Sequence, residues 1–142
     1  KGDINDLESV HALVGELAAY ENEPQAFTAT LEEYRKDFED GVFECIVAES
    51  SKGEIVGMTI QYLTYSTWKG RMLYLEDFVV KEAWRKHGIG QQLFDALFIR
   101  AEEMNCRLVK WQVLDWNEPA LSFYKKNNAV IEKNWWNVKK FI

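Results

Sequence analysis

The chain has 142 residues, of which 47% are hydrophobic and 28% are charged, a composition typical of a folded globular protein rather than a disordered one. This length suits a single domain, which we expect to span residues 1–142. No apolar run approaches the roughly 18 residues that a membrane span requires, and the net charge of −6 argues against nucleic acid as a partner.

The two cysteines indicate free thiols rather than a metal site. Cys45 and Cys106 lie far apart and form no C-x-x-C spacing. The histidines, His11 and His87, have no metal-ligand partner by spacing, so we expect no bound metal. Free thiols in apolar surroundings are typical of a reducing compartment, and we therefore predict a cytoplasmic protein.

Two helices are predicted at the start of the chain. Apolar residues recur at helical spacing between Asn5 and Glu21, with Asn5 and Glu8 as the expected capping pair. A second, short helix is expected to open at Thr30, where Glu33 would complete a capping box. No strand is evident before the first helix, and a first strand, if the architecture has one, is expected to be truncated or missing.

Three strands and a long helix are predicted next. The strands are expected over residues 43–49, 54–65 and 71–80, joined by turns rich in Ser, Gly and Lys. Within the second strand, Gly57 would mark a bulge or a close contact. The most regular helical pattern of the chain follows over residues 89–105.

The last part of the chain is predicted to add a strand, a helix and a strand, over residues 108–114, 120–126 and 130–140. Asn117 is the expected cap of this last helix. The passage from strand to helix to strand across residues 71–114 implies a parallel unit, whereas the hairpins are antiparallel. We therefore predict an α/β (α+β) fold with a mixed central sheet flanked by helices, in the order (β)ααβββαβαβ.

A glycine loop between the third predicted strand and the long helix has the features of an anion site. Leu93 stands where a dinucleotide fingerprint needs its third glycine, and the loop lacks the Gly-Lys-Ser/Thr of a P-loop. Amides at a helix N-terminus attract negative charge, and glycines let a pyrophosphate approach the backbone. The loop residues are Arg85, Lys86, His87, Gly88, Ile89 and Gly90.

Two carboxylates, Glu76 and Asp77, lie on the strand just before this loop. Successive strand residues face opposite sides, so only one of them would enter a given pocket unless a local bulge relaxed the alternation. A phosphate-bearing ligand bound beside these acids is the hypothesis that the stretch supports.

These stretches resemble a known family. The pattern R-x-x-G-x-G between strand and helix resembles the acetyl-coenzyme A binding motif of the GNAT acetyltransferase superfamily. The segments YLEDFVV, WRKHGIG and DWNEPALSFYKK resemble those of spermidine/spermine (diamine) acetyltransferases, as do LAAYENEP and TYSTW. The similarity runs roughly from Asp6 to Tyr124.

The resemblance implies a splayed sheet and an N-acetyltransferase that uses acetyl-coenzyme A. The amides of Arg85–Gly90 would hold the cofactor pyrophosphate. The backbone of Phe78 and Val80 would pair with the pantetheine arm like an added strand. Asn117 would hydrogen-bond the cofactor near its thiol end, and Tyr124 would contact the cofactor and protonate the departing thiolate.

The resemblance also assigns residues to the amine. Glu76 would accept the amine proton through a water, and Glu21 and Asp77 match acidic positions of the amine site. Trp68 would offer a cation–π face to an ammonium group, or simply pack in its turn. Because Ser66 stands where the family carries an acid, the acceptor could also be a lysine analogue such as thialysine, an aminoglycoside or a protein amine.

Two further alternatives concern activity and assembly. A non-catalytic acyl-coenzyme A binding module would keep the glycine loop but lack the acid and the base. Members of the family are commonly homodimers, and the resemblance implies the same here. Trp135 and Trp136 would lie on opposite faces of the last strand, with one ring in the core and the other facing a partner chain.

Overall fold

The fold is described from a computed structural model that covers all residues, 1–142. The chain divides into two units, Lys1–Gln112 and Val113–Ile142. The first unit contains the sheet, whose strands β1 (Glu44–Glu49), β2 (Ile55–Ser66), β3 (Gly70–Val80) and β4 (Leu108–Lys110) lie in this order. The hairpins β1–β2 and β2–β3 are antiparallel, and β4 runs parallel to β3. The predicted mixed sheet is confirmed.

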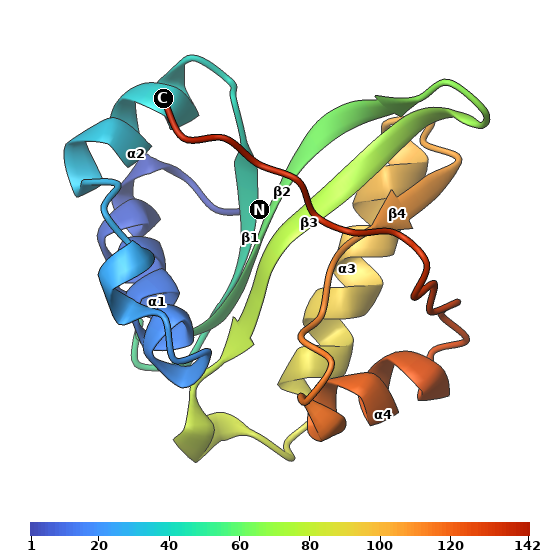
Figure 1. Ribbon diagram of the computed structural model, residues 1–142. Coiled ribbons are helices and arrows are strands. Elements are labelled where there is room, and N and C mark those ends of the chain that lie inside the picture. Colours follow the sequence, from blue (N-terminus) through green and yellow to red (C-terminus); the bar gives the residue numbers. More distant parts are fainter. The chain divides into compact units, whose positions relative to one another are not determined.

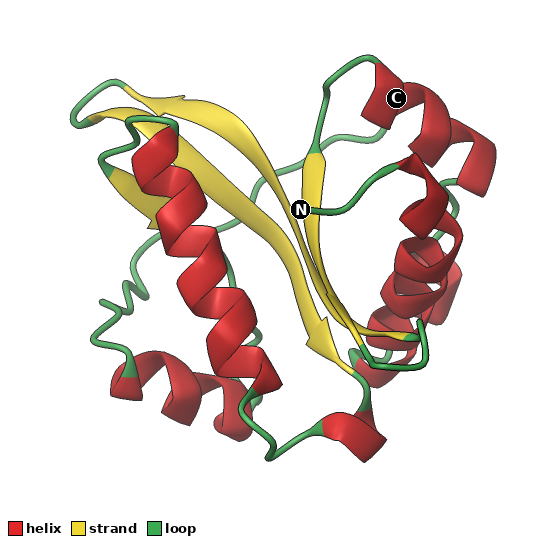
Figure 2. Cartoon of the chain, turned by 180° about the vertical axis from the view of Figure 1, so that it is seen from behind, coloured by secondary structure: helices red, strands yellow, loops and turns green.

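Helices cover both faces of this sheet. The helices α1 (Leu7–Tyr20) and α2 (Leu31–Glu39) lie on one side, and α3 (Ile89–Glu103) lies on the other (Figures 1 and 2). Short 3-10 turns η1 (Ile4–Asp6), η2 (Pro24–Ala26) and η3 (Glu82–Trp84) connect them to their neighbours. None of the helices is long and apolar enough to span a membrane.

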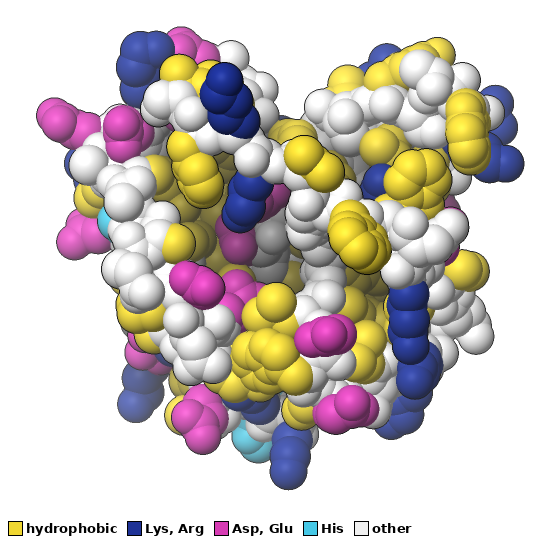
Figure 3. Space-filling view, in the orientation of Figure 1, with side chains coloured by type: hydrophobic (Ala, Val, Ile, Leu, Met, Phe, Trp, Pro, Cys, Tyr) yellow, Lys and Arg dark blue, Asp and Glu magenta, His cyan; other side chains and the backbone are white.

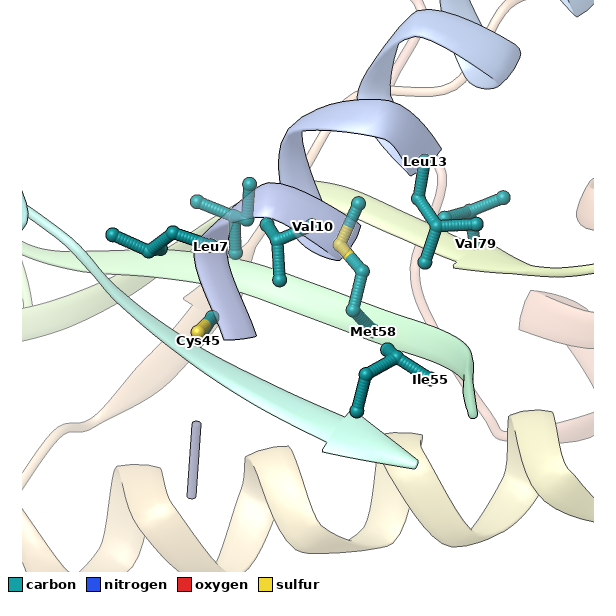
Figure 4. Packing of buried hydrophobic residues seen from close by; sticks show 8 residues of the cluster. Leu7, Val10, Leu13, Cys45, Ile55, Met58 and Val79 are labelled. Atoms are coloured by element: carbon teal, nitrogen blue, oxygen red, sulfur yellow. The ribbon is translucent and has the colours of Figure 1, made fainter. Parts of the chain in front are cut away.

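Each face of the sheet has its own hydrophobic core. Under α1, Leu7, Val10 and Leu13 are buried against strand residues (Figure 4). Those strand residues are Cys45, Ile55, Met58, Ile60 and Val79. On the other face, Leu97 and Ala101 of α3 pack with Leu73 and Leu75 of β3. The central strand therefore contributes to both cores, which explains its almost continuous apolar sequence.

Gly57 marks a close contact, one of the two roles predicted for it. A Cβ atom there would lie 3.0 Å from Leu93 Cδ1 and 3.1 Å from the Val79 carbonyl oxygen. Only a residue without a side chain lets β2 approach α3 this closely.

The first helix begins differently from the prediction. Asp3 forms a capping box with Asp6: the Asn5 amide donates to Asp3 Oδ1 at 2.8 Å, and the Asp3 amide donates to Asp6 Oδ2 at 2.9 Å. The predicted pair of Asn5 and Glu8 is wrong because the chain first makes the turn η1, which moves the cap toward the N-terminus. The predicted capping box of Thr30 at the start of α2 is confirmed.

The strands after α3 are shorter than predicted. β4 pairs with β3 only over Met72–Tyr74 and ends at Lys110. The predicted last strand over 130–140 does not form, and residues 130–142 contain no helix or strand. Trp135 and Trp136 are 70% and 89% exposed, so neither ring fills a core. An alternating pattern makes a strand only where a neighbouring strand supplies hydrogen bonds.

The second unit contains one helix, α4 (Glu118–Lys126). Asn117 is its N-cap, as predicted, and its Oδ1 accepts a hydrogen bond from the Ala120 amide at 3.3 Å. Pro119 lies in the first turn, where its missing N–H is tolerated.

Candidate active site

A β-bulge at Glu76 interrupts the central hairpin. The register pairs Gln61 with Leu75 and then Ile60 with Asp77, so Glu76 is an extra residue without a cross-strand partner. A bulge bends its strand and shifts the alternation of side chains by one residue. As a result, Glu76 and Asp77 both line one cleft, although neighbouring strand residues ordinarily face opposite sides.

This cleft has a volume of about 600 Å³ and is bounded by α2, the segment before it, β2 and β3. Its lining includes four carboxylates, Glu33, Asp37, Glu76 and Asp77, and contains no Lys or Arg. In the space-filling view, acidic side chains gather around the hollow in the face shown (Figure 3). The cleft is therefore suited to a cationic ligand.

Burial and neighbouring carboxylates raise the proton affinity of Asp77. Burial, followed by the negative charges of Glu76 and Glu21, raises the pKa of Asp77 to about 7. Burial also raises the pKa of Glu21. The charge of Glu21, at the end of α1, also acts on Asp77, but Glu21 is not among the residues that line the cleft, whereas Glu76 and Asp77 are.

Tyr62 holds the Glu76 carboxylate in place, a contact that sequence reasoning missed. The Tyr62 hydroxyl donates to Glu76 Oε2 at 2.9 Å. Burial raises the pKa of Tyr62, and so does this hydrogen bond, which keeps the phenol a donor. Tyr62 faces Tyr74 across the hairpin, and their rings stack at 5.4 Å. Only the cross-strand register could have revealed this partner.

Aromatic rings form the wall of the cleft next to α2. Tyr34 packs edge-on against Phe43 at 5.7 Å and against His11 at 4.8 Å. The His11 ring donates from Nε2 to the Ala29 carbonyl at 2.8 Å and so ties α1 to the segment before α2. His11 is thus a structural residue. Burial, followed by the charges of Asp77 and Glu76, raises the pKa of Tyr34 to about 12.

The glycine loop turns its backbone amides outward. Lys86 has φ 66° and Gly88 has φ 82°, both left-handed, which is a conformation that bends successive N–H groups toward one spot. The amides from Lys86 to Gly90 find no acceptor within the protein. A Cβ atom at Gly88 would meet nothing within 4 Å, so the space above the loop is open. These features fit a pyrophosphate at the N-terminus of α3.

Arg85 anchors this loop. Its Nε donates to the Val80 carbonyl at 2.9 Å, and its guanidinium lies 6.0 Å from the centre of the Tyr20 ring. Arg85, Lys86 and His87 are all exposed, and Arg85 and Lys86 can bring positive charge to an anion there.

The bulge lies beyond the part of β3 that pairs with β4. Pairing with β4 ends at Tyr74, so the following residues have no strand beside them on that edge. The Lys81 amide donates to Val56 of β2. Since backbone groups alternate along a strand, those of Phe78 and Val80 point away from β2. The Val80 carbonyl accepts its hydrogen bond from Arg85 there.

Trp68 and Ser66 are not brought to the cleft within this chain. Both lie at the β2–β3 turn, about 20 Å along the strand from Glu76 at about 3.3 Å per residue. Trp68 is 84% exposed, and Ser66 Oγ accepts a hydrogen bond from the Lys69 amide at 3.1 Å. Ser66 therefore completes the turn itself.

Asn117 and Tyr124 belong to the second unit. Tyr124 comes seven residues after Asn117, so the cap and the phenol lie on the same side of α4. Asn117 uses its Oδ1 for the cap, which leaves its amide N–H groups as the donors that a ligand could meet.

Stability should depend on pH through Asp77. Its folded-state pKa, about 7, lies above the ordinary 3.8, so the folded protein binds more protons than the unfolded chain between these values. The free energy of unfolding should therefore fall as pH rises from about 4 to 7. Asp77→Asn lacks this titrating carboxyl, so its free energy of unfolding should not show this fall. Between pH 4 and pH 8, the difference in unfolding free energy between the variant and wild type should therefore shift in favour of the variant, by at most about 4 kcal/mol.

Urea unfolding at both pH values measures this difference. Glu102→Gln, which neutralises an exposed carboxylate on α3, controls for the loss of one negative charge. A difference between Asp77→Asn and wild type that is the same at pH 4 and pH 8 would contradict the assignment.

Comparisons with known proteins agree with this geometry. Residues 10–129 match the acetyltransferase (GNAT) family. The chain is 35% identical to a thialysine N-epsilon-acetyltransferase of Bos taurus, over 96% of this chain and 86% of that protein. It is 32% identical to the human spermidine/spermine N(1)-acetyltransferase-like protein 1, over 90% of this chain but only 20% of that protein.

A solved structure supports the fold independently. The crystal structure of an aminoglycoside acetyltransferase from an uncultured soil metagenomic sample superposes with a TM-score of 0.80 at 20% identity, covering 99% of this chain and 95% of the other. At this identity the likeness shows the fold alone. The relatives are named as N-acetyltransferases, and their similarity is consistent with the diamine acetyltransferase branch; the protein is an acyltransferase that acts on amines. Because the family match spans most of the chain, the chain belongs to the GNAT acetyltransferase family.

Proposed function

We propose that residues 1–142 form one acetyltransferase domain that moves an acetyl group from acetyl-coenzyme A directly to a primary amine of a small diamine or polyamine-like substrate. The observation that carries this proposal is the bulge at Glu76, which gathers carboxylates in one cleft. The same strand leads into the glycine loop with its outward amides. The proposed amine site lies on β3, and the proposed anion site lies in the loop that follows β3 and η3.

The cleft supplies the groups that an ammonium substrate needs. Glu76 is the proposed base: it accepts the amine proton, through a water, so that the nitrogen lone pair becomes free. Its carboxylate is already oriented by the Tyr62 hydroxyl. Asp77, whose pKa is raised to about 7, would be partly protonated near neutral pH and would release this proton when an ammonium group enters, because an opposite charge favours the ionised carboxylate.

The loop and the open strand edge fit acetyl-coenzyme A. When bound, this cofactor supplies the thioester that the free amine attacks. The amides from Lys86 to Gly90 would hold the pyrophosphate, and the backbone of Phe78 and Val80 would hold the pantetheine arm. Asn117 is the proposed hydrogen-bond donor near the thiol end. Tyr124 is the proposed acid, which gives the proton of its Oη to the leaving thiolate.

A second candidate acceptor is a lysine analogue such as thialysine. The bovine relative carries that substrate in its name, and Ser66 replaces the acid that the polyamine pattern would have at the turn. A non-catalytic acyl-coenzyme A binding module is less well supported, because both Glu76 and Tyr124 are present.

We also propose that the protein is cytoplasmic and forms a homodimer. Both cysteines are free thiols, as a reducing compartment allows. The dimer is supported by the family resemblance and by the exposed rings of Trp135 and Trp136, which offer apolar surface to a partner.

Thiol release in the presence of acetyl-coenzyme A and a panel of amines tests the function. We expect turnover with diamines or polyamines that exceeds turnover with thialysine and with an aminoglycoside at equal concentration. Preference for thialysine would select the second candidate. Stabilisation of the protein by acetyl-coenzyme A without turnover of any amine would favour the binding module.

Tyr124→Phe should remove the proposed acid while keeping the ring. General acid catalysis contributes about 10²–10⁴-fold, so we expect kcat to fall by at least about 100-fold while the affinity for coenzyme A, measured by calorimetry, changes little. The matched control is Tyr65→Phe, which removes the hydroxyl of an exposed tyrosine on β2. A Tyr124→Phe enzyme with wild-type kcat would exclude Tyr124 as the acid.

A further inference from the structure

A second pair of carboxylates faces the cleft from α2, on the side opposite β3. Glu33 and Asp37 lie four residues apart, and both line the cleft. Glu33 is already used: its Oε2 accepts a hydrogen bond from the Thr30 amide at the start of the helix. The side chain of Asp37 makes no hydrogen bond and no salt bridge; its backbone carbonyl accepts a hydrogen bond from the Val42 amide at 2.9 Å, at the end of α2. It is the carboxylate of α2 that remains available to a ligand.

The surface between the two acidic sides is aromatic and apolar. Tyr34, one turn before Asp37, also lines the cleft. Burial, followed by the charges of Asp77 and Glu76 on β3, raises its pKa. Phe43 packs edge-on against Tyr34 at 5.7 Å, and Ile60 adds an aliphatic surface. The cleft is thus lined by carboxylates of α2 and of β3, together with aromatic and aliphatic side chains.

This distribution of charge matches an unbranched chain with an ammonium group at each end. The hydrocarbon would cover the aromatic wall, and each ammonium would meet a carboxylate. An amino acid of the same length would carry its own carboxylate toward Asp37. Because no Lys or Arg lines the cleft, nothing there would balance that negative charge, and the like charges would repel.

We propose that Asp37 determines specificity by binding the distal ammonium group of the acceptor, while Glu76 and Asp77 receive the amine that is acetylated. This inference rests on the proposed function and extends it: the preferred acceptor is an α,ω-diamine, and α2 is the element that discriminates it from a carboxylate-bearing amine. Asp37 is far from the acid and base in the sequence, and no motif identifies it.

Three substrates that share one carbon chain test the proposal. 1,5-Diaminopentane carries both ammonium groups, n-pentylamine lacks the distal one, and lysine adds a carboxylate. In Asp37→Asn we expect kcat/KM for the diamine to fall about 10-fold or more, as for the loss of a charge-assisted hydrogen bond. The value for n-pentylamine should stay within about 2-fold, and discrimination against lysine should shrink.

The control variant is Glu39→Gln, which neutralises an exposed carboxylate of the same helix outside the cleft; its substrate preference should equal that of wild type. An equal fall for the diamine and n-pentylamine in Asp37→Asn would overturn the proposal, because Asp37 would then act on the protein or the chemistry rather than on the distal charge. An unchanged diamine value would also overturn it.

Calorimetric binding of 1,5-diaminopentane separates this inference from the proposed function. If wild type acetylates no amine but binds the diamine in a manner that Asp37→Asn abolishes, the proposed function fails and the role of Asp37 stands. If wild type turns over amines while Asp37→Asn binds the diamine as wild type does, the role of Asp37 fails and the function stands. If wild type neither turns over nor binds the diamine, both fail.

Discussion

One extra residue in β3 determines the arrangement of the site. The bulge at Glu76 shifts the alternation of the strand, so that two successive carboxylates line a single cleft. Beyond it, β3 does not pair with β4, and the backbone of Phe78 and Val80 points away from β2. The strand then ends in the loop that opens α3. A regular strand would have hidden one of the two acids on the opposite face and left the other alone.

The cleft concentrates negative charge that the protein itself leaves uncompensated. Asp77 resists ionisation because of burial and the neighbouring charges of Glu76 and Glu21, and the lining offers no Lys or Arg. This repulsion between carboxylates destabilises the free protein, and a bound cationic ligand would offset it. Such a conflict between function and stability is common at functional sites. Elsewhere the chain does pair its charges: Arg100 of α3 binds Glu44 of β1 through two hydrogen bonds of 2.8 and 3.0 Å. The contrast supports a cleft shaped for an amine.

The helices and the position of the glycine loop could be predicted from local sequence patterns, whereas contacts between strands could not. Helical spacing and the Thr30 capping box depend on neighbouring residues, and the structure confirms both; it also places the glycine loop at the start of α3, as predicted. The contact of Tyr62 with Glu76 depends on the register of a hairpin, which the sequence does not specify, and the position of Asp37 depends on how α2 packs. The strand predicted over 130–140 is absent because alternation in sequence does not supply a partner strand.

The central claim is that β3 binds the amine at the bulge, through Glu76 and Asp77, and binds coenzyme A beyond it. Amide chemical shifts in a labelled sample test this claim directly. Coenzyme A should shift the amides of residues 86–90 together with Phe78 and Val80. Subsequent addition of 1,5-diaminopentane should shift those of Tyr34, Asp37 and Asp77 and leave the loop almost unchanged. If both ligands shifted the same amides, or if coenzyme A left residues 86–90 unperturbed, the division of the strand between cofactor and amine would be contradicted.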